Sequence, residues 1–345
     1  MYGAYVLGNL VALLFFGHVS DEIGRRRTIL AAMAIAITSA LVFLLADSLA
    51  CLYAARILSG IGIGIATGAG TAWLAELVGR KDKSRATAIA TGANFVGLAA
   101  SALAAGILAQ YAPWPLQLPF IIYIAALLVV TAMIWRTEET VAHPRGLRSI
   151  SLRPSVSVPA QIRAEFVAPA LTGFGAMALV GFFAAIGPTI LAQDLHETNH
   201  AVAGALFGEM AIIVSATILA TQSMSSGTAM RLGLWLMIPS VVLVVSAQVL
   251  ASMWLLIVAT AFCAVAAGLG YRGSLQVVNQ IAPERKRAAI VSSYFICGFS
   301  GNALPVIGVG VISTLAGAVI ADTIFAGLII AFALVALGIR LIHDK

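Results

Sequence analysis

Charged residues are scarce in this sequence. Lys, Arg, Asp and Glu together make up 10% of its 345 residues, whereas an ordinary soluble domain holds roughly 25%. Hydrophobic residues make up 61%, and the mean hydropathy is +1.02. No soluble core needs so many apolar side chains. The composition therefore excludes an ordinary soluble protein and indicates a polytopic membrane protein.

Cysteine is scarcer still. The three cysteines, Cys51, Cys263 and Cys297, lie in or beside apolar segments, and none has the Cys-x-x-Cys spacing of a metal or redox site. We expect them to be buried packing thiols.

Motifs of enzymes and of nucleic-acid-binding proteins are also missing. We find no Ser-His-Asp order, paired acidic motif, Gly-rich phosphate loop or Cys/His cluster, and the net charge of +6 forms no basic patch interleaved with aromatics. The residue types near 194–200 suit a metal, but a solvated loop is the better interpretation; they are Asp194, His196, Glu197 and His200. Asp47 and Asp322 are expected to cap helices at the outer face. We expect no metal, no cofactor, no nucleic-acid partner and no enzymatic activity.

Apolar runs of about the length needed to cross a bilayer follow one another along the chain. We predict eleven helices, near 1–17, 28–46, 50–79, 84–110, 117–135, 166–193, 201–221, 229–250, 253–279, 288–315 and 319–342. In this arrangement every loop Lys and Arg falls on one side, and only Arg56 and Arg272 lie within apolar segments. Because basic loops stay in the cytoplasm, that side and the C-terminus are predicted to be cytoplasmic.

A short polar segment joins the first two runs, Gly17-His18-Val19-Ser20-Asp21-Glu22-Ile23-Gly24-Arg25-Arg26-Arg27. It resembles the Gly-x-Leu-Ala-Asp-Arg-x-Gly-Arg-Arg signature of the major facilitator superfamily (MFS) of secondary transporters. The matching residues are Gly17, Asp21, Gly24, Arg25 and Arg26, and the departures are Val19, Ser20 and Glu22. In that family the signature lies between the second and third helices.

The resemblance implies an all-α fold of two pseudo-symmetric helix bundles that exchange access to a central site. The expected domains are an N-terminal half at 1–135, a cytoplasmic linker at 136–165 and a C-terminal half at 166–345. Because five helices precede the linker, the first family helix is expected to be missing.

The implied function is alternating-access transport of a small-molecule substrate, with protons as the coupling ion, by a monomer in the lipid bilayer of a bacterial inner membrane. The alternatives are a truncated, non-transporting membrane protein or a polytopic membrane enzyme.

The resemblance also implies a cytoplasmic gate. Glu76, at the cytoplasmic end of its helix, is expected to pair with Arg25, and Asp21 is expected to approach the start of the helix near Arg287. A carboxylate there would complement the positive end of the helix dipole. The alternative is a solvated charge cluster that only sets topology.

Arg56 is the most costly residue for a membrane helix. With Gly60 and Gly62 it resembles an Arg-x-x-x-Gly-x-Gly pattern of the family, which implies an arginine in the central cavity and close helix packing at the glycines. The alternative is an arginine that reaches the outer headgroups, because it lies about 9 Å from the helix start.

Five more polar residues are candidates for the cavity or for proton coupling; they are Asn94, Glu209, Arg272, Gln276 and Asn279. Glu209 lies in mid-helix, where burial favours its neutral form, so it suits a proton carrier; the alternative is a permanently neutral Glu bonded to a Ser or Thr. Arg272, Gln276 and Asn279 share one helix face, although Arg272 is close enough to the cytoplasmic end to reach it. Asn94 lies between Gly92 and Gly97, without the Gly-Pro-x-x-Gly-Gly pattern of many drug antiporters.

Overall fold

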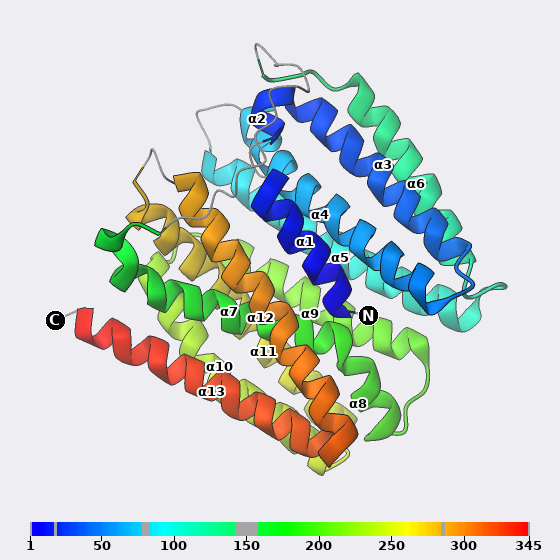
Figure 1. Ribbon diagram of the computed structural model, residues 1–345. Coiled ribbons are helices and arrows are strands. Elements are labelled where there is room, and N and C mark those ends of the chain that lie inside the picture. The colour runs from blue at the N-terminus through cyan, green and yellow to red at the C-terminus, as the bar shows by residue number, and fades with distance from the viewer. Residues whose placement is uncertain (1, 17–18, 78–82, 142–157, 284–286, 344–345) are drawn as a thin grey trace. The chain divides into compact units, whose positions relative to one another are not determined.

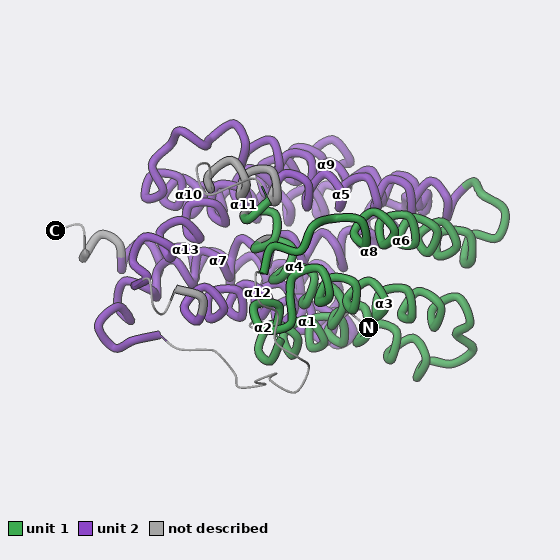
Figure 2. Tube along the Cα trace, turned by 90° about the horizontal axis from the view of Figure 1, so that it is seen from above, with its two compact units in different colours: residues 1–91, 111–156 green, residues 92–110, 157–345 purple. Residues whose placement is uncertain are grey.

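The structure is a computed structural model that describes residues 2–16, 19–77, 83–141, 158–283 and 287–343. In these ranges the chain is α-helical and contains no strand, so the predicted all-α fold is confirmed. It divides into two compact units, residues 1–91 with 111–156 and residues 92–110 with 157–345 (Figure 2). Each unit is described separately.

The first unit is built on the long helix α4. Within it, α1 and α3 pack along α4, and α6 packs on α3 (Figure 1). Its elements are α1 (Tyr2–Phe16), α2 (Val19–Ile23), α3 (Arg25–Leu44), α4 (Leu49–Leu77), the start of α5 (Lys83–Tyr111) and α6 (Leu118–Arg136).

Glycines let the helices of this unit approach closely. A Cβ on Gly60 would overlap the carbonyl oxygen of Tyr5 on α1, and one on Gly8 would overlap the carbonyl oxygen of Ile57 on α4. Gly62 faces Ala32 of α3. Because lipid is as apolar as the side chains, membrane helices associate largely through such close backbone packing. Gly60 thus lies against the backbone of α1 and Gly62 against that of α3, and their role in helix packing remains a prediction.

The second unit has α11 near its centre. Helices α7, α9 and α10 pack against α11, and α12 and α13 pack on α7. The elements are residues 92–110 of α5, the 3₁₀ turn η2 (Ala160–Ile162), α7 (Arg163–Ala185), α8 (Gly187–Gln193), α9 (His200–Ala220), α10 (Ser226–Val249), α11 (Met253–Ile281), α12 (Arg287–Ala316) and α13 (Ala318–His343).

Ten of the described helical segments are long and apolar enough to cross a membrane, and Gly3–Phe16 is a shorter apolar helix. Two details of the sequence prediction are wrong. The run predicted as one helix over 166–193 is broken at Ile186 into α7 and α8, because Pro188 in the first turn of α8 cannot continue a helix ladder. The segment predicted as a loop at 18–27 contains the short helix α2.

The predicted domain boundaries remain a prediction. Residues 92–110 of α5 group with the second unit, although the predicted N-terminal half includes them. Most of the predicted linker, residues 142–157, and the signature residue Gly17 lie outside the described residues.

Candidate functional site

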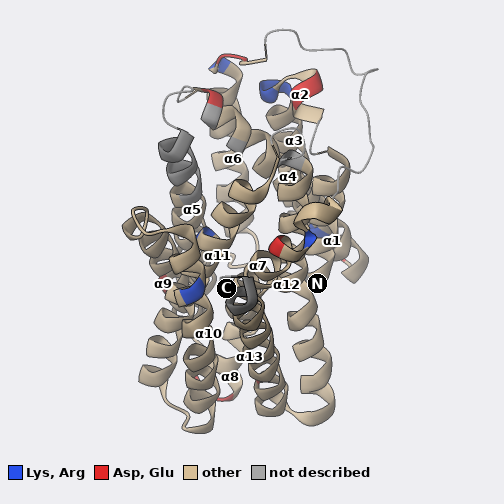
Figure 3. Cartoon of the chain, turned by 90° about the vertical axis from the view of Figure 1, so that its left-hand side faces the viewer, with Lys and Arg blue, Asp and Glu red and all other residues tan. Residues whose placement is uncertain are grey.

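Arg25, the first residue of α3, lies at the centre of a charged cluster in the first unit. Its Nη2 is 2.5 Å from Asp21 Oδ1 and 2.9 Å from Glu76 Oε1, and its Nη1 donates to Ser20 Oγ at 2.6 Å. The planar guanidinium suits this arrangement because it presents donors in several fixed directions. Figure 3 shows acidic and basic residues beside each other at α2. The expected pair between Arg25 and Glu76 is present.

Glu139 caps the N-terminus of α3. Its two carboxylate oxygens accept hydrogen bonds from the backbone N–H groups of Arg25, at 2.9 Å, and Arg26, at 3.0 Å. These donors are otherwise unpaired at a helix start, and a negative charge is favourable there. Glu139 was not predicted from the sequence. The available signal was that the first turn of α3 holds three arginines and no acid, while two glutamates follow the end of α6.

Gly24 is required by this cap. Its backbone adopts φ 104° and ψ 146°, which side chains rarely tolerate. A Cβ there would also lie 2.5 Å from Glu139 Oε2. This explains why the signature has glycine immediately before its arginines.

Glu76, past the apolar part of α4, joins the same cluster. Thr140 Oγ1 and Arg25 both donate to its carboxylate. Burial raises the pKa of Glu76, but these hydrogen bonds and the charge of Arg25 outweigh burial, so the pKa lies below its ordinary value. Trp73, one turn earlier, donates from Nε1 to the carbonyl oxygen of Glu138 at 3.1 Å. The cluster therefore ties α2, α3 and α4 to the chain that leaves α6.

Arg56 lies at the opposite end of the same unit. Its guanidinium carbon is 5.3 Å from the ring centroid of Phe43, a cation–π distance, and Phe43 stacks on Phe120 of α6. Among the described residues no acidic side chain pairs with Arg56. Because Arg56 lies beside the last turn of α3, its position agrees with the alternative, an arginine that reaches toward the outer end of its helix. Its role in a cavity remains a prediction.

Glu209 is half-buried in the middle of α9. In the part of the chain that the structure describes, it has no hydrogen bond and no ion pair, so the alternative bond to a Ser or Thr is not found there. Asn94 of α5 is exposed, and Gly92 of α5 faces Ser215 and Leu219 of α9.

Arg272 is buried, whereas the two polar residues expected to share its face are exposed. It is 6% exposed, and its Nη2 donates to the carbonyl oxygens of Gln222 and Met224, both at 2.9 Å. Gln276 and Asn279 are exposed. Arg272 thus holds the connection between α9 and α10.

Asp322 differs most from its sequence interpretation. Predicted as a helix cap at the outer face, it is 2% exposed and accepts a hydrogen bond from Gln248 of α10. The helical periodicity of α13 could have indicated this, because Asp322 lies one turn before the buried Ala326.

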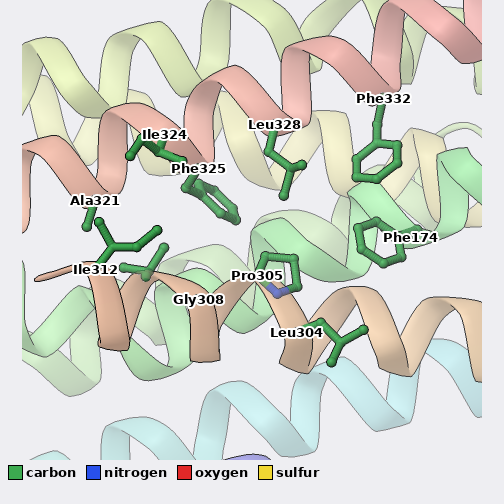
Figure 4. Close-up of a pocket in the computed structure, with 11 residues that line it drawn as sticks. Phe174, Leu304, Pro305, Gly308, Ile312, Ala321, Ile324, Phe325, Leu328 and Phe332 are labelled. Atoms are coloured by element: carbon green, nitrogen blue, oxygen red, sulfur yellow. The ribbon is translucent and has the colours of Figure 1, made fainter.

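The second unit also contains an apolar pocket of about 300 Å³ between α7, α12 and α13. Figure 4 shows its walls, with Phe174 from α7, Pro305 from α12 and Phe325 from α13. Phe174 and Phe332 form an aromatic contact at one end, 4.8 Å between centroids. The lining offers no charged group, so the pocket has the chemistry of an acyl-chain contact and not of a polar solute site.

Known proteins similar to this chain are membrane transporters. The family model described as Major Facilitator Superfamily matches residues 1–306. Multidrug resistance protein D of Escherichia coli strain K12 is 43% identical over 63 residues, which cover 18% of this chain and 16% of that protein. Multidrug transporter MdfA of Yersinia pestis biovar Antiqua strain Angola is 28% identical over 143 residues, 41% of this chain and 34% of that protein. The matches thus span about a third or less of the length of these curated relatives.

A solved structure shares the fold over almost the whole chain. The crystal structure of the human organic anion transporter MFSD10 (TETRAN) aligns with a TM-score of 0.66 and 20% identity, covering 97% of this chain and 82% of that one. At this identity the likeness concerns the fold alone.

Proposed function

The chain belongs to the major facilitator superfamily, and from this membership we propose that it is a proton-coupled secondary transporter of a small organic solute, working by alternating access. That it is a membrane transporter and not an enzyme follows from the family match and from the multidrug transporter that part of it resembles. The coupling ion, the solute and the gate residues are the proposal.

Proton coupling rests above all on Glu209. This carboxylate is half-buried in mid-helix and has no partner among the described residues. An unpaired carboxylate at membrane depth is costly when charged, so it is readily protonated where it faces no water. A group that gains and loses a proton as its surroundings change is what coupling requires.

The gate is proposed at the cluster around Arg25. Alternating access needs contacts at one end of the molecule that form in one state and break in another. Arg25 has three side-chain partners, Ser20, Asp21 and Glu76. Because Asp21 remains 54% exposed, its contact can be exchanged without dismantling the rest of the cluster.

Drug-like organic compounds are the first solutes to test, because the matched relatives are named as multidrug transporters. We place the protein in a bacterial inner membrane as a monomer, with the cluster around Arg25 and the C-terminus in the cytoplasm.

The test is transport in membrane vesicles with a panel of drugs and metabolites, with and without an imposed proton gradient. We expect gradient-dependent flux by the full chain. Glu209→Gln should weaken the dependence on the gradient while the protein still expresses and binds solute. The matched control is Glu197→Gln, the same change outside the α9 span. Unchanged pH dependence in Glu209→Gln would end the coupling role of this residue.

A further inference from the structure

Three polar side chains meet at one end of the second unit, where α8 and α10 end and α13 begins. The Gln248 amide nitrogen lies 3.1 Å from Asp194 Oδ2 and 2.5 Å from Asp322 Oδ2. Gln248 is in the last turn of α10, Asp194 directly follows α8, and Asp322 is in the second turn of α13. One amide group therefore bridges two carboxylates.

The centre of this triad is buried and only partly paired. Asp322 is 2% exposed and Gln248 is 4% exposed. Asp322 Oδ1 and Gln248 Oε1 have no hydrogen-bond partner among the described residues. An unsatisfied buried oxygen costs about 1–3 kcal/mol, and more when it is charged. The two oxygens without a hydrogen-bond partner thus indicate that a ligand binds at this site.

No positively charged residue of the surrounding described helices lies at the end where the triad is. Helices α7, α10 and α12 pack against α13. Apart from Asp322 itself, the charged residues of these four helices lie at their opposite ends; they are Arg163 and Glu165, Arg231, Arg287, and Arg340 and His343. On the near side, the connection from α8 to α9 carries His196, which is exposed, and Glu197, which accepts from the backbone of Asn199. Asp194 is therefore the charged group next to Asp322.

We propose that Asp322 is a proton-binding site whose hydrogen-bond partner is Gln248. Two carboxylates that share one donor in a buried place cannot both remain charged without compensation. The more deeply buried one, Asp322, takes the proton from solvent onto a carboxylate oxygen, and no other bond is made or broken in this step.

The Gln248 amide can also act as the acceptor of this bond, because its oxygen takes a hydrogen bond from a protonated acid. The oxygen and nitrogen of a side-chain amide are assigned from their hydrogen bonds. With the amide turned over, protonated Asp322 donates to Gln248 Oε1.

Proton binding then controls Asp194. While both acids are charged, the Gln248 NH₂ group holds the two carboxylates together. Once Asp322 is protonated and the amide turns, Asp194 loses its donor, and because it is only half-buried it can turn to water. The site thus links protonation to the contact between the end of α8 and the start of α13. It is distinct from Glu209, and proton binding here does not depend on the transport function proposed above.

Infrared spectroscopy of the purified full chain tests the proposal, because a protonated acid has a C=O band that a carboxylate lacks. We expect the carboxylic-acid absorption to include a component from Asp322 at pH values where exposed carboxylates are still charged. Asp322→Asn should lack this component, whereas that of Glu209 remains. The asparagine keeps a donor for Gln248 Oε1, so this variant should fold. The matched control Asp47→Asn, at an exposed aspartate in the connection from α3 to α4, should keep the Asp322 component.

A second variant covers the case in which Asp322→Asn does not fold. Gln248→Leu keeps the acid and removes its acceptor, so the Asp322 component should move to higher frequency. An unchanged Asp322 component in Gln248→Leu, or an Asp322→Asn spectrum identical to that of the wild type, would overturn the proposal. Stabilisation by Na⁺ without a titrating component from Asp322 would also overturn it, because the two unpaired oxygens would then hold a cation.

Discussion

At the scale of single residues, Arg25 and Glu139 show how charge fixes the start of a membrane helix. Arg25 binds acidic groups through its side chain, and its backbone N–H is capped by Glu139. Both kinds of contact are charge-assisted, and such bonds are roughly twice as strong as neutral ones. One residue therefore orients α3 toward α4 and toward the chain beyond α6.

Gly24→Ala should destabilise the first unit. Alanine would have to adopt a backbone conformation that glycine alone tolerates. Its Cβ would also overlap the Glu139 carboxylate. Strain of this kind costs about 1–3 kcal/mol. Thermal unfolding in detergent measures it. Gly68→Ala, in the same unit, is the control, because a Cβ at Gly68 meets no atom within 4 Å. Equal melting temperatures of the two variants would contradict the cap.

The pKa of Glu76 predicts how stability responds to acid. Because this pKa is lower in the folded chain than in the unfolded one, its contribution is complete above the unfolded value and is lost as the pH falls through the folded value. The carboxylate is partly exposed, so we expect at most about 1 kcal/mol. Melting temperature against pH should fall less steeply in Glu76→Gln than in the wild type, and parallel curves would refute the assignment.

Residue contacts could be predicted only where a known pattern names both partners. The pair between Arg25 and Glu76 came from the family resemblance. Glu139 and Thr140 were missed because they lie more than 110 residues and more than 60 residues from their partners, and nothing local marks such pairs. Asp322 was misread because a charge near a helix start has the same local pattern whether it caps the helix or is buried.

At the scale of elements, α7 and α12 are packed backbone to backbone. A Cβ on Gly181 of α7 would overlap the carbonyl oxygen of Asn302 on α12, and a Cβ on Gly301 would overlap that of Phe174 on α7. The Asn302 amide adds a hydrogen bond to the Met177 carbonyl oxygen at 3.1 Å. Two helices in lipid gain little from burying side chains, so this close contact is what holds them together.

Gly181→Ala should therefore separate α7 from α12. Extra atoms in a closely packed contact cost about 1–3 kcal/mol. Gly308→Ala is the matched control on α12, since a Cβ at Gly308 would meet no heavy atom within 4 Å, and replacing a helical glycine there should stabilise by about 0.5–1 kcal/mol. Opposite shifts in melting temperature are expected, and a stabilised Gly181→Ala would show that the contact is loose.

Elements were the most predictable level, because a run of apolar residues leaves little choice in a bilayer except a helix. Only details smaller than a whole helix were predicted wrongly. The break at Ile186 needs the local effect of Pro188, which a hydropathy window averages away, and α2 is too short and polar to register as a run.

At the scale of the whole molecule, composition and one signature sufficed for the fold class, since membrane solvation restricts the architectures available. The proposed gate is different, because its function would depend on exchange between two states, and a single arrangement contains only one of them. A variant that separates transport from folding is needed to test it.

Asp21→Asn is that variant. Asp21 is 54% exposed, and Arg25 keeps Glu76 at 2.9 Å and Ser20 at 2.6 Å without it. Because Asp21 is exposed and the buried Arg25 keeps its pair with Glu76, the change should cost no more than about 1 kcal/mol. Expression and melting temperature should therefore stay near those of the wild type. Transport should fall several-fold, because the exchangeable contact of the gate has lost its charge. Asp47→Asn, the same change in the connection from α3 to α4, should leave flux unchanged. Normal flux by well-expressed Asp21→Asn would show that the cluster around Arg25 only shapes the fold.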